Sequence, residues 1–305
     1  MLLVFLGPFV FLLFFLTVAV QVVRDARILK KLPVVVIALS ALVIPCRTTA
    51  QTTKPDQSSP AATPPGQSQE TAEPSAPSPE PDYERPISWK LMARNWVADQ
   101  KQIWSFPARL VQGQNLAPTA GVVGVTAGLV FLDPHEAGYF RTTSTFHGFS
   151  NIFTGNATAI GMGMVPASLY ALGRFRKDSK MQHTALLAGE ALADIAAVQT
   201  VLKDVARRTK PSRYPATGWF DSKGAPSSYI RGNGSFPSGH TMAAFSVATI
   251  MARRYRNHRW VPYVAYGLAS AVGFSRLALN VHFASDVFMG GAIGYSISRF
   301  TVLRQ

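Results

Sequence analysis

The sequence is poor in cysteine and in acidic residues. Cys46 is the only cysteine among 305 residues, which excludes an intramolecular disulfide and a cysteine-bound metal cluster. Asp and Glu number 16 against 30 Lys and Arg, so the net charge is +14 and anionic partners are favoured. Zinc-ligand spacing, a recognition-helix signature and an aromatic-basic platform are all missing from the sequence. Nucleic acid is therefore not expected as a partner.

Charge is also missing from residues 1–23, which are apolar and long enough to span a bilayer. A basic patch follows at 24–31, and residues 28–50 combine an apolar run with a small-residue ending, as an export signal does. Two interpretations of the leader (1–50) are open: a pair of membrane helices, or a signal peptide with an upstream extension. Residues 51–86 are rich in Pro, Ser, Thr, Gln and Glu, which cannot bury a core and predict a disordered linker.

From residue 87 onward the apolar pattern is helical. Residues 89–104 form an amphipathic segment, and the pattern breaks at Pro107. Further apolar segments follow; they are rich in Ala and Gly with scattered β-branched residues, which favours helices over strands. We therefore predict an all-α domain over 87–305, a helical bundle with a core of about six helices. The apolar segments lie near 117–133, 155–173, 183–207, 239–256, 260–276 and 286–303.

Three polar clusters interrupt these segments, and the first is KDVARRTKP at 203–211. On a helix that Pro211 ends, Lys203 and Lys210 lie close to two turns apart, so their ammonium groups point the same way. Basic residues at a helix C-terminus also offset the helix dipole, so this cluster alone has an ordinary structural explanation.

The second cluster, Pro237-Ser238-Gly239-His240, precedes an apolar helix. The unpaired N–H groups of a helix N-terminus are a ready anion site. Ser238 acting only as an N-cap, with His240 solvated in the first turn, would account for the same residues.

The third cluster is SRLALNVHFASD at 275–286. His282 and Asp286 are four residues apart and can meet on a helical turn. A carboxylate that accepts a hydrogen bond from one imidazole nitrogen makes the other nitrogen a better nucleophile or base. Arg276 offers a planar fork suited to phosphate oxygens.

The three clusters, in this order, resemble the signature of the type 2 phosphatidic acid phosphatase and vanadium haloperoxidase superfamily. The resemblance covers roughly residues 115–303. In its first part, Lys203 and Pro211 match, but Lys210 stands where the family usually has Arg. Lysine keeps the positive charge and loses the bidentate fork. The second part matches at 237–240, and the third matches at Ser275, Arg276, His282 and Asp286.

The resemblance implies a catalytic mechanism. His282 would attack phosphorus in line, Asp286 would orient it, and His240 would protonate the leaving oxygen. A phosphohistidine would then hydrolyse. The donors to the phosphoryl oxygens would replace a metal, so no metal or other cofactor is expected. These phosphate-binding residues would be Lys203, Lys210, Ser238, Gly239 and Arg276.

The expected function is therefore a metal-independent phosphatase that acts on a phosphomonoester or diphosphate, with lipid-linked substrates such as phosphatidic acid or a prenyl diphosphate. Two alternatives are a vanadate-dependent haloperoxidase on the same fold and a non-catalytic envelope protein that binds anionic lipid. Elsewhere, Glu190 and Asp194 lie four apart in an apolar helix and are expected to form a water-facing edge rather than to orient the lysines.

Basic loops at 173–180 and 253–259 join core helices at the ends away from the clusters. If the core spans a membrane, the positive-inside rule puts these loops in the cytoplasm and the clusters outside it. If the leader is a cleaved signal peptide, the consistent alternative is an exported domain whose helices do not span. Both interpretations place the protein in the cell envelope with its site outside the cytoplasm.

Overall fold

The computed structural model describes residues 85–212, 218, 220 and 234–304. The predicted leader and nearly all of the predicted linker lie outside these residues, so the leader, the linker and their boundaries stay predictions. The described residues form α-helices, a short π-helical stretch and one isolated bridge between Arg208 and Phe220. The all-α prediction is confirmed.

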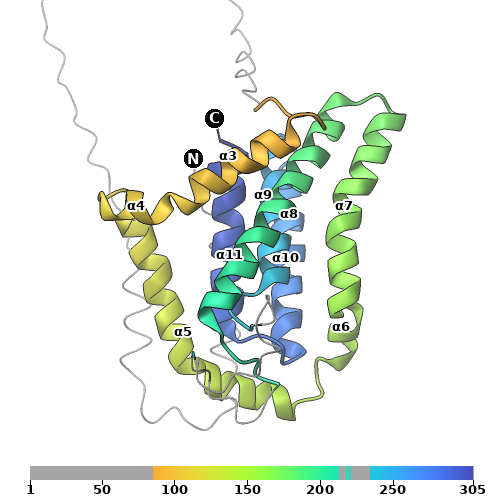
Figure 1. Ribbon diagram of the computed structural model, residues 1–305. Helices are drawn as coiled ribbons and strands as arrows, with labels where there is room; N and C mark the ends of the chain where they lie inside the picture. Colours follow the sequence, from red (N-terminus) through yellow and green to blue (C-terminus); the bar gives the residue numbers. More distant parts are fainter. Residues whose placement is uncertain (1–84, 213–217, 219, 221–233, 305) are drawn as a thin grey trace, which may run out of the picture. The chain divides into compact units, whose positions relative to one another are not determined.

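Each of the predicted apolar segments is a helix of the bundle in Figure 1. These are α5 (Leu116–Thr142), α7 (Gly155–Phe175), α8 (Ser179–Ala206), α9 (Gly239–Arg254), α10 (Val261–Ala278) and α11 (Ala284–Ile297), which continues into the π-helical η3 (Ser298–Val302). Shorter helices are α3 (Met92–Trp104), α4 (Phe106–Val111) and α6 (His147–Ile152).

The predicted break near Pro107 separates α3 from α4. Helix α3 ends at Trp104, and Pro107 lies in the first turn of α4. A proline is tolerated there because the N–H that it lacks would have no partner within the helix.

Glycines on α11 bring this helix against the start of α9. A Cβ added at Gly290 would lie 2.7 Å from the carbonyl oxygen of Ser238, and one added at Gly294 would collide with that of Met242. Only residues without a side chain allow two backbones to approach this closely. The second and third polar clusters, far apart in the sequence, thereby meet at one end of the bundle.

Two clusters of buried apolar side chains hold the helices together. One joins α5, α9, α10 and α11, and its largest members include Phe140, Phe245 and Tyr266. The other joins α8, α9 and α11 with the segment before α3, and includes Ile195 and Met242. Helix α9 contributes to both clusters, so it is the central helix of the packing.

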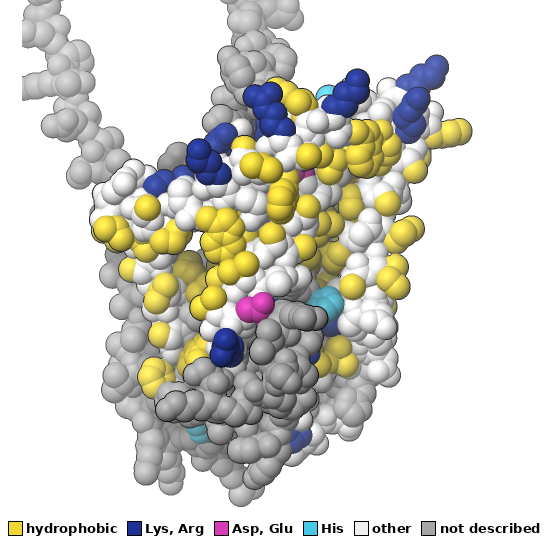
Figure 2. Space-filling view, in the orientation of Figure 1, with side chains coloured by type: hydrophobic (Ala, Val, Ile, Leu, Met, Phe, Trp, Pro, Cys, Tyr) yellow, Lys and Arg dark blue, Asp and Glu magenta, His cyan; other side chains and the backbone are white. Residues whose placement is uncertain are grey.

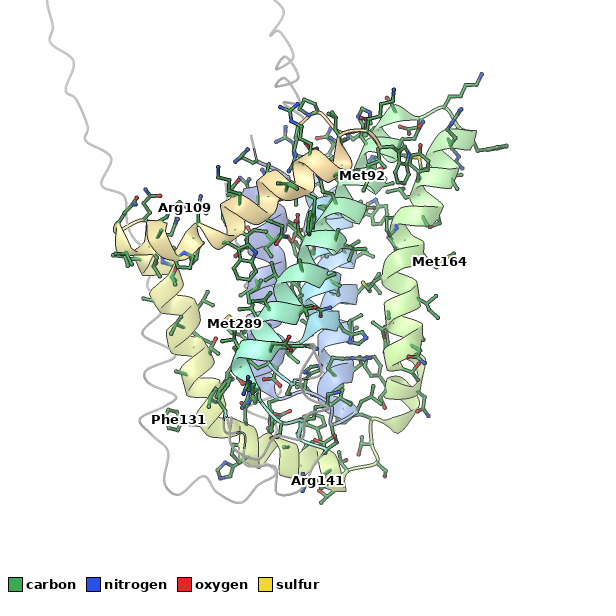
Figure 3. All side chains as sticks on the ribbon, in the orientation of Figure 1. Met92, Arg109, Phe131, Arg141, Met164 and Met289 are labelled. Carbon is green, nitrogen blue, oxygen red and sulfur yellow. The ribbon has the colours of Figure 1, made fainter. Side chains whose placement is uncertain are left out.

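Outward-facing apolar side chains cover α5 and α7. Phe131 and Met164 are 77% and 58% exposed, and Figure 3 shows them on these two helices. By length and composition, α5 and α8 could each cross a membrane. Half of the most apolar 18-residue stretch of α8 is buried inside the protein, as in the core helix of a soluble protein. The corresponding stretch of α5 is only 11% buried. The surface of α5 is thus the stronger of the two indications of a lipid environment.

The expectation of a water-facing edge at Glu190 and Asp194 is wrong. Both side chains are buried, because α3 packs across α8 and covers them. Arg85 Nη2 donates to Glu190 Oε1 at 3.1 Å, and Gln100 Nε2 donates to Asp194 Oδ1 at 2.8 Å. These carboxylates therefore hold α3 in place.

Candidate active site

His282 and Asp286 lie at the start of α11. Asp286 is in the first turn of the helix, where its Oδ2 accepts the Phe283 N–H at 2.9 Å. His282 precedes the helix, and its Nδ1 is 3.6 Å from Asp286 Oδ2. The two residues are brought together as predicted, at a separation longer than a good hydrogen bond.

The backbone carbonyl of Ser235 determines which nitrogen of His282 is free. His282 Nδ1 lies 2.7 Å from this oxygen. Because a carbonyl oxygen only accepts hydrogen bonds, Nδ1 carries the proton and the lone pair of the neutral ring lies on Nε2. The imidazole is thus held in the tautomer that a nucleophile or base requires.

Asp286 is bound most directly by Arg208. Arg208 Nη1 is 2.5 Å from Asp286 Oδ1, and the Ser235 hydroxyl donates to Asp286 Oδ2. Both side chains of the ion pair are fully buried. The Asp286 carboxylate is therefore held from several sides, and its charge stands beside the His282 ring.

Arg208 also joins the site to α5. Its Nη2 lies 2.6 Å from Asp133 Oδ2, its Nη1 donates to the Ser285 hydroxyl at 2.6 Å, and its Nε donates to the Gly218 carbonyl at 2.9 Å. The guanidinium packs over the ring of Phe283, 4.3 Å from its centroid. A buried guanidinium with two carboxylates and further acceptors is compensated as a buried charge must be.

The position of Arg208 corrects the prediction for the first cluster. Helix α8 ends at Ala206 rather than at Pro211, and Arg207 has a left-handed backbone with φ 46°. The chain turns here and carries the Arg208 side chain into the protein. Lys203 remains on α8 and Lys210 lies beyond it, so the two lysines do not share one helix face.

Carboxylates of α5 bind the N-terminus of α11. Asp133 Oδ1 accepts the Ser285 N–H at 3.2 Å, and Glu136 Oε2 accepts the Ala284 N–H at 3.1 Å. The first N–H groups of a helix lack partners within the helix, and these side-chain oxygens supply them. Helix α5 thus supports the first turn that carries Asp286.

The second cluster forms the N-terminus of α9. Ser238 is the N-cap residue; its N–H donates to the Asp286 main-chain oxygen at 3.0 Å, and its hydroxyl lies 2.9 Å from Thr241 Oγ1. Gly239 begins the helix, and a Cβ there would collide with the side-chain amide of Gln199. The glycine is therefore required by a close contact with α8.

His240 lies in the first turn of α9. Its Nε2 is 3.1 Å from the carbonyl oxygen of Gly155, at the start of α7. Since this oxygen only accepts, Nε2 carries a proton and Nδ1 is left to take up and release another. Burial, and then the charge of Arg276, lower the pKa of His240 to about 4.

The pKa of His282 is lowered as well. Burial is the largest cause, because the protonated ring loses its hydration, and the nearby Asp286 acts in the opposite direction. Both imidazoles are therefore neutral near pH 7 in the free site. This suits His282 as a nucleophile, whereas His240 needs added negative charge nearby to hold a second proton.

Arg276, at the end of α10, faces α6 and α7. Its Nη2 donates to the Phe153 carbonyl oxygen and lies 3.2 Å from Thr158 Oγ1. Its own carbonyl oxygen accepts the N–H of His282 at 3.3 Å, which ties the two residues of the third cluster together. Within the described residues, no group of His, Cys, Asp and Glu has an arrangement that could hold a metal ion.

The C-terminal part of the chain matches a known protein family. The model of the PAP2 superfamily matches residues 182–305, which contain all three polar clusters. This part of the chain is thus similar to the PAP2 superfamily. The match includes nearly all of α8 and the whole of α9, α10 and α11, the helices nearest to the predicted site residues.

Two curated proteins from Porphyromonas gingivalis are similar to parts of this chain. A lipid A 1-phosphatase is 44% identical over 61 residues, which are 20% of this chain and 14% of the relative. A lipid A 4'-phosphatase is 30% identical over 93 residues, 30% of this chain and 38% of the relative. The chain thus spans well under two thirds of the length of either relative.

A solved structure also resembles this chain. It is the crystal structure of a transmembrane PAP2-type phosphatidylglycerolphosphate phosphatase from Bacillus subtilis, with 18% identity and a TM-score of 0.36. The alignment covers 69% of this chain and 92% of that one.

Sequence reasoning missed several residues of the candidate site. In the sequence, Arg208 is only one of the residues between Lys203 and Lys210. Ser235 contacts His282 through its carbonyl oxygen and Asp286 through its hydroxyl. Asp133 and Glu136 had a detectable signal, because two carboxylates three residues apart interrupt an apolar segment. Gln199 carried none, since its contact with Gly239 arises only when α8 and α9 pack.

Proposed function

We propose that this protein is a metal-independent phosphatase that hydrolyses a phosphomonoester or diphosphate through a phosphohistidine intermediate. The observation that carries the proposal is the contact of His282 Nδ1 with the Ser235 carbonyl oxygen, 2.7 Å away. It leaves the lone pair on Nε2, while the buried Asp286 carboxylate lies on the Nδ1 side of the ring, 3.6 Å from Nδ1. A buried imidazole in this tautomer is suited to nucleophilic attack on phosphorus.

In the first step, His282 Nε2 forms a bond to phosphorus while the bond from phosphorus to the leaving oxygen breaks. His240 transfers a proton to that oxygen. The phosphorylated imidazole carries positive charge, which the Asp286 carboxylate stabilises. In the second step, water attacks phosphorus, His240 takes a proton from it, and the N–P bond breaks to release inorganic phosphate.

Cationic and N–H donors would stabilise the charge on the phosphoryl oxygens. Lys203, Lys210 and Arg276 supply three positive charges, and Gly239, the first residue of α9, supplies its backbone N–H group. Such fixed donors act where charge develops in the transition state. The Ser238 hydroxyl would exchange its contact with Thr241 for one with the substrate.

Arg208 acts through Asp286 rather than on the substrate. Its fork binds Asp286 and Asp133 together, so it fixes the carboxylate against the His282 ring. The Arg208 charge also keeps Asp286 ionised in a buried environment. We assign Arg208 as a positioning residue.

A phosphorylated lipid is the substrate class that the comparisons support. Both curated relatives are lipid A phosphatases, and the outward-facing apolar surface of α5 suits a protein that works beside lipid. The site lies at the end of the bundle opposite to the basic loops 173–180 and 253–259. The positive-inside rule then supports a membrane-associated protein with its site outside the cytoplasm.

The proposal is tested with the purified full chain in detergent containing EDTA. Phosphate release is measured from lipid A, phosphatidic acid and a prenyl diphosphate, for wild type and for His282→Ala. Labelled phosphate should remain on wild-type protein quenched in alkali, where phosphohistidine is stable, and should be absent from His282→Ala. Full turnover in His282→Ala would overturn the nucleophile assignment. Bromide oxidation with vanadate and peroxide, in place of phosphate release, would instead support the haloperoxidase alternative.

A further inference from the structure

Helix α3 presents exposed charge of one sign. Lys90, just before the helix, and Arg94 and Lys101 within it are all exposed. The acidic residue of the helix, Asp99, is buried, and its carboxylate is bound by Arg85 Nη1 at 2.7 Å. The outer surface of α3 is therefore positively charged.

Tryptophans occupy the sector of α3 beside this charge. Trp89, Trp96 and Trp104 are 63%, 37% and 44% exposed, and Val97 is 60% exposed. At about 100° per residue, Trp96, Val97 and Trp104 lie between the buried face of the helix and the sector of Arg94 and Lys101. We call the three tryptophans, Val97, Lys90, Arg94 and Lys101 the α3 surface.

The end of the bundle that carries α3 also combines basic and hydrophobic side chains elsewhere on its surface. Figure 2 shows Lys and Arg side chains along the upper edge of the described residues, with hydrophobic side chains directly below them. The basic loops at 173–180 and 253–259 lie at this end, where α7 joins α8 and α9 joins α10. In Figure 3, Met92 and Arg109 mark this end, and Arg141, whose Nη2 binds the Pro211 carbonyl oxygen near the first polar cluster, marks the other.

Specific contacts hold α3 on the bundle. Arg85 bridges Asp99 and Glu190, and Trp89 Nε1 donates to the Tyr170 hydroxyl at 2.7 Å. At its other end, Gln102 Nε2 donates to the Phe300 carbonyl oxygen at 3.1 Å. The α3 surface is thus presented in a fixed orientation.

We propose that the α3 surface binds an anionic lipid bilayer in the plane of its interface. The tryptophans lie at the boundary between headgroups and acyl chains, where amphipathic rings are favoured. Lys90, Arg94 and Lys101 contact the phosphates of anionic headgroups. The positive charge of α3, with no exposed acidic residue on this helix, complements an anionic bilayer surface. An apolar protein partner would not match this charge. This binding involves none of the proposed catalytic residues and is independent of the proposed function.

Tryptophan fluorescence in reconstituted bilayers tests the position of the α3 surface. The full chain keeps Trp96, and its other tryptophans are replaced by Phe. Lipids brominated near the glycerol end of the acyl chain should quench Trp96 more than lipids brominated near the bilayer centre, and aqueous iodide should quench it weakly. Strong iodide quenching without bromolipid quenching would place α3 in water and overturn the proposal. Protection from all quenchers would mean that protein covers α3, which overturns it equally.

Lipid selectivity tests the charge. Quenching of Trp96 is measured in two mixtures of the same composition: brominated phosphatidylglycerol with unlabelled phosphatidylcholine, and unlabelled phosphatidylglycerol with brominated phosphatidylcholine. We expect phosphatidylglycerol to be enriched beside Trp96 by roughly fivefold, the scale of one basic residue near an anionic surface. The enrichment should fall towards unity in Lys90→Gln/Arg94→Gln/Lys101→Gln, and should persist in the matched control Arg174→Gln/Arg176→Gln/Lys177→Gln. Equal enrichment in wild type and in the α3 variant would refute the assignment.

If the variant with Trp96 as its single tryptophan fails to fold, the difference in quenching between wild type and Trp96→Phe reports the same position. A difference spectrum quenched by iodide alone would again overturn the proposal.

Discussion

Arg208 and Asp286 form a buried ion pair in which Nη1 lies 2.5 Å from Oδ1, and the same guanidinium reaches Asp133 on α5. Asp286 is four residues from His282 in the sequence, yet it contacts Arg208 more closely than it contacts the histidine. The orientation of the Asp286 carboxylate is thus set by Arg208, a residue outside the three-part signature.

Replacing Arg208 tests its positioning role. Arg208→Ala leaves two buried carboxylates without their partner, and loss of one member of a buried pair costs about 3–5 kcal/mol of stability. Arg208→Lys keeps a charge but cannot bind both carboxylates with one planar fork. We expect kcat of Arg208→Lys to fall roughly ten- to hundredfold, as small misplacements of catalytic groups do, with KM changed little. Arg207→Lys, at the exposed neighbouring position, is the control and should leave kcat intact.

Asp286→Asn removes the charge beside His282 and should cut turnover by roughly a hundredfold or more, within the range of general acid–base contributions. His282→Ala should abolish turnover. The control is His258→Ala, an exposed histidine in a basic loop at the other end of the bundle. Steady-state phosphate release checks the three variants. Near-normal rates in Asp286→Asn would contradict the assignment of Asp286 as the carboxylate that orients His282.

The pH profile should be bell-shaped, with an optimum between mildly acidic and neutral pH. His282 must be neutral to attack, and its lowered pKa keeps it neutral down to mildly acidic pH. His240 must be protonated, and its pKa of about 4 in the free site makes protonation depend on negative charge brought by the phosphate. The alkaline limb of kcat, which reports the bound complex, should therefore lie at higher pH than that of kcat/KM. Coincident alkaline limbs, or a profile flat from about pH 5 to 9, would be inconsistent with these assignments.

Gly290→Ala should destabilise the protein and lower its activity. The added methyl group meets the Ser238 carbonyl oxygen at 2.7 Å, so α9 must move away from α11 at the site. Gly267→Ala on α10 is the matched control, because no atom lies within 4 Å of its added Cβ. Removing a helix-interior glycine there should be neutral or stabilise by up to about 1 kcal/mol. Thermal unfolding in detergent, measured together with kcat, distinguishes the two variants.

Lys210→Arg introduces the residue that the family usually has at this position. If Lys210 binds the phosphate, the planar fork should preserve or lower KM, whereas Lys210→Ala should raise KM by roughly tenfold, since a hydrogen bond to a charged group contributes about 1.5–3 kcal/mol. Substrate titrations of both variants measure the effect. An unchanged KM in Lys210→Ala would remove Lys210 from the phosphate-binding set.

Much of the local organisation followed from the sequence alone. The helical period and the Ala and Gly content of each apolar segment identified the core helices, because amphipathic pattern and helix propensity are local properties. The His282–Asp286 spacing and the Pro237–His240 turn are local as well, so these residues could be named without a structure. Their proposed roles stay predictions until activity is measured.

The tertiary structure alone decided which distant groups share the site. Asp133 and Ser285 are 152 residues apart, and Arg208 and Asp286 are 78 apart, so neither contact has a signal in local periodicity. The burial of Glu190 and Asp194 has no local signal either, because their spacing is also that of a water-facing edge and only the packing of α3 covers them. Burial and ion pairing depend on which helix faces meet, and close approaches such as that of Gly290 to Ser238 determine those faces. The sequence thus determined the helices and the reactive residues, and packing determined how the acid, the arginine and the histidine are placed relative to one another.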